Sequence, residues 1–69
     1  MPIIRAEILE GRTPEMKERF IEALTAAAVE ALGVRAEQVR VIINEMPKTN
    51  YGIAGKSVAR RDREAAEQK

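Results

Sequence analysis

The sequence of 69 residues is predicted to fold as one small α+β domain built around a β-α-β unit. Two observations predict this class. Residues 3–9 and 39–45 are short segments rich in β-branched and aliphatic residues, as is typical of strands. Between them lies one long segment with helical periodicity and recognisable start and stop signals. Two strands joined by a single helix form a parallel pair with a right-handed crossover.

The first strand is expected over residues 3–9, with Ile4, Ala6 and Ile8 on the core face. A turn at residues 10–12 leads into the helix. Thr13 is the expected N-cap, Pro14 the first helical residue and Glu15 the acidic residue of the first turn. The helix is expected to end near Leu32, with Gly33 as its C-cap. One broad apolar stripe is expected along it, formed by Met16, Phe20, Ala23, Leu24, Ala27 and Ala31 and widened by Ile21, Ala28 and Leu32.

The second strand, residues 39–45, carries apolar residues on both faces. This pattern indicates burial on both sides, so a second subunit is expected to cover the face that the helix leaves open. A turn-rich loop follows at residues 46–52, and Gly52 and Gly55 predict a short hairpin that reaches a neighbour. From Ser57 onward the chain is charged, which fits either a frayed helix or a disordered tail. We divide the chain into a domain at residues 1–58 and a charged tail at residues 59–69.

Composition excludes several classes of function. The net charge is +1, from 12 basic and 11 acidic residues, and the only aromatic residues are Phe20 and Tyr51, so nucleic-acid binding is not expected. There is no apolar run that could span a bilayer and no signal segment, so no membrane partner and a cytoplasmic location are expected. Without Cys or His, neither a disulfide nor a Cys/His metal site is expected. A chain this short with 45% hydrophobic residues predicts a homo-oligomer.

Pro2 is the most informative single residue. Because the chain has no His, the remaining group that titrates near neutral pH without perturbation is the α-amino group. Removal of Met1 would leave Pro2 with a free secondary amine, which is a candidate general base. The alternative is that the Met-Pro opening has no catalytic meaning and Pro2 starts an edge strand.

Four pieces of the sequence match one family in order and spacing. They are Pro2, ILEGR at residues 8–12, VRVIINEMPK at residues 39–48 and YGIAG at residues 51–55. The chain therefore resembles the 4-oxalocrotonate tautomerases, small enzymes with an amino-terminal proline, over residues 2 to about 58. The resemblance implies a β-α-β tautomerase fold with a short C-terminal hairpin. It also implies that the two parallel strands of each chain join larger sheets in an oligomer, with a hexamer as the expected assembly.

The resemblance also implies roles for residues. Pro2 would take a proton from the substrate and return it to a different carbon. Arg40, supplied by a neighbouring subunit, would engage one carboxylate and the carbonyl oxygen where negative charge grows, and Arg12 would bind a distal carboxylate. Leu9 and Ile53 match apolar walls, and Tyr51 matches an aromatic position beside the proline.

Each role has a structural alternative. Taken without the resemblance, Arg12 would hydrogen-bond a loop and Tyr51 would be ordinary loop packing. Arg40, a cation within an aliphatic strand, needs a partner or a cavity. Two positions depart from the family pattern: Tyr51 adds a hydroxyl group where phenylalanine or tryptophan is frequent, and Ala54 replaces a frequent glycine. We expect Ala54 to be tolerated if its φ is negative.

The implied activity is an isomerase reaction, a cofactor-independent keto-enol or dienol tautomerisation of a 2-hydroxydienoate or 2-oxoenoate acid, in aromatic catabolism. A second hypothesis is a dehalogenase or hydratase of small unsaturated acids, in which the proline acts as a protonated acid and an extra carboxylate activates water. A third is a non-catalytic assembly module. The pH profile separates the two enzymes, since a free-amine base gains activity as pH rises through its pKa and an ammonium acid loses it.

Overall fold

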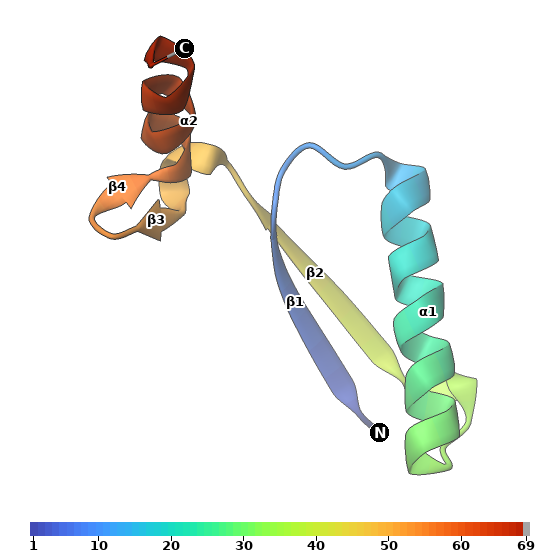
Figure 1. The fold of residues 1–69 in the computed structure, drawn as a ribbon. Coiled ribbons are helices and arrows are strands. Elements are labelled where there is room, and N and C mark those ends of the chain that lie inside the picture. The colour runs from blue at the N-terminus through green and yellow to red at the C-terminus, as the bar shows by residue number, and fades with distance from the viewer. Residues whose placement is uncertain (69) are drawn as a thin grey trace.

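The computed structural model describes residues 1–68 and contains the predicted β-α-β unit, followed by a hairpin and a second helix (Figure 1). The elements in chain order are β1 (Ile3–Leu9), α1 (Pro14–Leu32), the 3-10 helix η1 (Ala36–Gln38), β2 (Arg40–Met46), the 3-10 helix η2 (Lys48–Asn50), β3 (Gly52–Ile53), β4 (Lys56–Ser57) and α2 (Val58–Glu67). None of the helices within residues 1–68 is both long enough and apolar enough to cross a membrane.

β1 and β2 pair in parallel, as predicted, in a register that runs from Ile3 opposite Arg40 to Leu9 opposite Met46. The ladder continues past both ends of β1. The Arg40 backbone N–H donates to the Pro2 carbonyl oxygen at 3.0 Å, and the Glu10 N–H donates to the Met46 carbonyl oxygen at 2.9 Å. β2 is shifted by one residue from the expected 39–45, because the Val39 N–H bonds to the Ala36 carbonyl oxygen and closes η1.

The predicted ends of α1 are confirmed. The Thr13 hydroxyl accepts a hydrogen bond from the Met16 backbone N–H at 3.2 Å, and Pro14 is the first helical residue. At the other end Gly33 adopts the left-handed conformation, with its N–H donating to the Val29 carbonyl oxygen at 3.0 Å. Side chain and backbone thereby satisfy groups that a bare helix end leaves without partners.

The core lies between α1 and one face of the two-stranded sheet. Its most buried members are Ala28 and Val39, which are 6% and 9% exposed. The broad apolar stripe of α1 is only partly covered within one chain: Ile21 and Leu24 lie with Ala28 on the half-buried side, while the other large residues of the stripe are exposed. Met16 is 44%, Phe20 38% and Leu32 61% exposed. Two strands present a surface only about 10 Å wide, so they cover one helical face and leave the second open.

The chain is too extended for an ordinary globular monomer. Its radius of gyration is 16.2 Å, whereas a compact chain of this length has one of about 11 Å. Its accessible surface is 5322 Å², whereas a folded monomer of this mass exposes roughly 4,300 Å². Figure 1 shows the reason, since the hairpin and α2 stand away from the β-α-β unit at one end of the sheet.

The hairpin lies where it was predicted, with β3 and β4 joined by Ala54 and Gly55. Both turn residues have positive φ, 53° for Ala54 and 83° for Gly55, as a two-residue hairpin turn of this type requires. The condition set for Ala54, a negative φ, is therefore not met. Beyond the hairpin the charged tail is helical: the Ser57 hydroxyl caps α2 by accepting from the Arg60 N–H at 3.1 Å. The boundary between residues 58 and 59 stays a prediction.

Candidate functional site

The six residues predicted for the site form two groups at opposite ends of the sheet. Pro2 and Arg40 lie at the start of the parallel pair, where the N-terminus is seen in Figure 1. The other four, Leu9, Arg12, Tyr51 and Ile53, line one depression at the far end. Leu9 lies seven positions after Pro2 along extended chain, a distance of roughly 23 Å. One chain therefore does not bring the two groups together.

At the first end, Pro2 is half-buried and joins the ladder through its carbonyl oxygen alone. Proline has no backbone N–H to donate, so its ring nitrogen takes no part in the sheet. The Arg40 side chain is exposed, and its Nη1 donates to the Glu37 carbonyl oxygen. The partner that a cation in this strand was expected to need is thus a backbone carbonyl at the end of η1.

At the second end, the depression measures about 290 Å³ and lies between the end of β1 and the hairpin. Gly11 turns the chain sharply after β1 with a φ of 123°, a value that favours glycine. This turn brings Arg12 back over the strand, where its Nη1 donates to the Leu9 carbonyl oxygen at 3.2 Å. The structural alternative for Arg12, a hydrogen bond to its own loop, is therefore present, and the guanidinium still lines the depression.

Three further residues line the same depression, namely Glu7, Ile8 and Val58. Glu7 precedes Leu9 by two positions on β1, so strand alternation alone places both side chains on one face and could have identified it. Ile8 was expected only in the core. Val58 carries no signal in the sequence, because its place depends on how the hairpin folds back.

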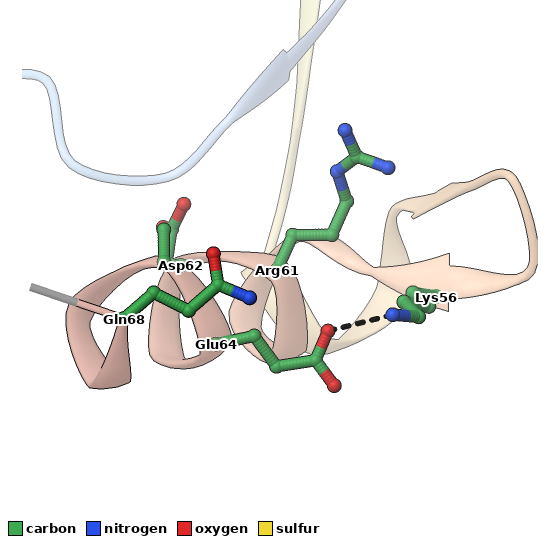
Figure 2. A pocket seen from close by; sticks show the side chains of 6 residues that line it. Lys56, Arg61, Asp62, Glu64 and Gln68 are labelled. Atoms are coloured by element: carbon green, nitrogen blue, oxygen red, sulfur yellow. Dashed lines mark hydrogen bonds and ion pairs between the residues drawn. The ribbon is translucent and has the colours of Figure 1, made fainter.

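The hairpin wall is held in place by α2. The Val58 N–H donates to the Tyr51 carbonyl oxygen at 2.8 Å, so the first residue of α2 fixes the backbone beside β3. Two ion pairs then tie the helix to the preceding elements. Lys56 of β4 contacts Glu64 at 2.7 Å, as Figure 2 shows, and Lys48 of η2 contacts Asp62 at 3.0 Å.

A larger depression, about 450 Å³, lies along α2 itself and is lined by Lys56, Arg61, Asp62, Glu64, Ala65 and Gln68 (Figure 2). Three of its four charged side chains form ion pairs: Glu64 accepts hydrogen bonds from Lys56 and, at 3.0 Å, from Arg60, and Asp62 pairs with Lys48. These two hydrogen bonds hold the pKa of Glu64 below its usual value, and the bond from Lys56 has the larger effect. None of the predicted site residues lines this depression, so we assign it a structural role.

Two further polar residues of β2 have structural partners. Glu45 pairs with Lys17 at 2.8 Å, joining the start of α1 to the end of β2. Asn44 donates through Nδ2 to Glu7 Oε1 at 3.1 Å, across the open face of the sheet. Within residues 1–68, no three His, Cys, Asp or Glu side chains gather closely enough to hold a metal ion.

Comparison with known proteins gives consistent results. A family model described as Tautomerase enzyme matches residues 2–61. The chain is 49% identical over 57 residues to a 2-hydroxymuconate tautomerase of Comamonas testosteroni, covering 83% of this chain and 90% of the relative.

Two solved structures are also close. TomN, a 4-oxalocrotonate tautomerase homologue in the tomaymycin biosynthetic pathway, superposes with a TM-score of 0.88 at 48% identity, covering 90% of this chain and 95% of that one. A heterohexameric 4-oxalocrotonate tautomerase from Chloroflexus aurantiacus gives a TM-score of 0.82 at 42% identity, with coverage of 86% and 95%. The predicted β-α-β fold with its hairpin is confirmed.

Proposed function

The chain belongs to the tautomerase enzyme family and is an isomerase, and from this premise we propose that Pro2, freed by removal of Met1, is its general base. The substrates we assign to it are 2-hydroxydienoate or 2-oxoenoate acids with one or two carboxylates. The similarity to the 2-hydroxymuconate tautomerase of Comamonas testosteroni supports this assignment. We also propose that the enzyme acts in aromatic catabolism and in the cytoplasm.

The chemistry requires only a base and a positive group. The Pro2 nitrogen removes the proton of the 2-hydroxyl group, the C2–O bond becomes a carbonyl, and the conjugated double bonds shift. The same nitrogen then returns the proton to a carbon of the former dienol. No atom or electron is gained or lost, so no cofactor is needed. Arg40 stabilises the negative charge on the oxygen.

The separation of the two groups of residues is the observation that carries the proposed assembly. Pro2 and Arg40 lie at one end of β1, roughly 23 Å from the depression that contains Arg12 and Tyr51. A substrate of this class is far shorter than that distance. The complete site therefore combines residues of more than one subunit: Pro2 of one subunit, the depression of another, and Arg40, which the resemblance assigns to a neighbour of the subunit that supplies Pro2.

Exposed apolar surface supports the same conclusion. Met16 and Phe20 on α1, Ile3 and Ile42 on the open face of the sheet and Ile53 on the hairpin are all between 38% and 51% exposed. Burying such side chains contributes about 25 cal/mol per Å² of apolar area. We infer a homo-oligomer, and the heterohexameric Chloroflexus relative favours a hexamer.

The experiment tests whether the Pro2 nitrogen is a free terminal amine and whether activity depends on it. Intact mass spectrometry establishes whether Met1 is absent from the active preparation. Pro2→Ala is expected to reduce kcat/KM for dienol loss, followed by ultraviolet absorbance, by about a hundredfold or more. A preparation that retains Met1 is expected to be inactive, because the Pro2 nitrogen is then an amide. Pro14→Ala, at the first position of α1, is the matched control and keeps its activity. Undiminished turnover by a chain that retains Met1 would refute the proposal.

A further inference from the structure

The depression at the end of β1 contains a carboxylate that the proposed mechanism does not use. Glu7 lines it together with Arg12, Tyr51 and Leu9. Asn44 Nδ2 occupies one acceptor site of the Glu7 carboxylate, at Oε1. An ionised carboxylate offers about four such sites, so Glu7 can accept a further hydrogen bond. The depression therefore pairs an acceptor with the Arg12 donors.

This pairing suits one kind of ligand group better than another. A carboxylate at the distal end of a substrate is attracted by Arg12 but repelled by Glu7, and its two oxygens offer Glu7 no donor. A carboxamide can bind to both side chains, because its carbonyl oxygen accepts a hydrogen bond from a guanidinium and its NH₂ group donates one to a carboxylate. A hydroxyl group also donates and accepts. Tyr51 also lines the depression, and its hydroxyl group has both capacities.

Resting on the proposed function, we infer that Glu7 is a specificity-determining residue. It selects 2-hydroxydienoates whose distal end is an uncharged hydrogen-bonding group, a carboxamide or a hydroxyl, over those that end in a second carboxylate. The single carboxylate of the selected substrate lies at the proline end with Arg40. Arg12 then holds the distal carbonyl or hydroxyl oxygen, and Glu7 accepts its hydrogen.

The experiment compares two substrates on the assembled wild-type enzyme. One is a dienol with carboxylates at both ends, and the other is its distal monoamide. The wild type is expected to turn over the monoamide with the higher kcat/KM. Glu7→Gln is expected to shift the ratio of the two kcat/KM values about tenfold toward the dicarboxylate. The shift is expected because the substitution removes the unit charge that repels the distal carboxylate.

Two controls keep the result specific. Glutamine retains an oxygen that can accept from Asn44, so Glu7→Gln removes the charge with little change of shape. Glu10→Gln removes the same charge three residues along the chain, from an exposed residue outside the depression, and is expected to leave the ratio unchanged.

A second measurement needs no variant. Saturated analogues of the two substrates are used as competitive inhibitors of the wild type, and the monoamide is expected to bind more tightly. Equal or tighter binding of the dicarboxylate would overturn the inference, as would an equal shift of the ratio in Glu7→Gln and Glu10→Gln. If activity depends on Pro2 but the ratio of the two kcat/KM values is unchanged in Glu7→Gln, this inference alone is refuted. If activity does not depend on the Pro2 amine, the proposed function is refuted.

Discussion

Replacing Ala54 by glycine is expected to stabilise the hairpin that forms one wall of the site. Ala54 has a φ of 53°, in the left-handed region. That conformation costs an L-residue about 1–2 kcal/mol. Glycine removes this strain but loses about 0.4–1 kcal/mol through the greater freedom of the unfolded chain. The balance is a gain of about 0.5 kcal/mol, and Ala54→Asn should gain a similar amount because Asn-Gly suits this turn.

The assay uses a probe that the chain provides. Tyr51 is the only tyrosine and there is no tryptophan, so tyrosine fluorescence reports on the residue next to β3, while circular dichroism follows the helices. Unfolding by urea is measured with both. For a domain of this size, a gain of about 0.5 kcal/mol raises Tm by roughly 2–4 °C.

Two glycines of the same hairpin serve as controls. Gly55→Ala introduces a side chain at a φ of 83° and is expected to destabilise by about 1 kcal/mol. Gly52 has no positive φ, and a Cβ there would lie 3.9 Å from the Lys56 carbonyl oxygen, which is an ordinary contact. Gly52→Ala is therefore expected to be neutral or slightly stabilising. Destabilisation by Ala54→Gly together with a neutral Gly55→Ala would refute the reasoning.

Three other predictions concern the core, the assembly and the pH dependence. Val39→Ala removes two buried methyl groups and should therefore lower the free energy of unfolding by about 2 kcal/mol, measured by urea titration. A loss below about 0.5 kcal/mol would contradict the assigned core. Phe20→Glu should weaken self-association at least about tenfold in sedimentation velocity by placing a charge on the open face of α1; Glu22→Gln, on the charged face, should not. Because the pKa of Glu64 is lowered from 4.5, its ion pairs stabilise the fold at neutral pH, and this contribution is lost as pH falls through the lowered pKa. Glu64→Gln should remove that part of the dependence of Tm on pH, and identical acid profiles for variant and wild type would exclude it.

Local chemistry in the sequence was sufficient to predict the elements. Thr13, Pro14 and Gly33 mark the ends of α1 because capping depends on a few adjacent residues. The strand segments predicted β1 and a parallel β2, and the error of one residue in β2 arose where η1 uses the Val39 N–H. The ambiguous tail formed a helix through Ser57 and its ion pairs with η2 and β4.

The arrangement of the site depended on tertiary structure. The sequence identified Pro2, Arg40, Arg12 and Tyr51 as candidates, but only the parallel register shows that they occupy opposite ends of one sheet. The division of the α1 stripe into a packed face and an open face depended on the width of two strands. Glu7 lines the depression because residues 51, 53 and 58 lie on the other side of it from the end of β1. Patterns along a chain describe each element by itself, whereas distances between elements depend on how they pack.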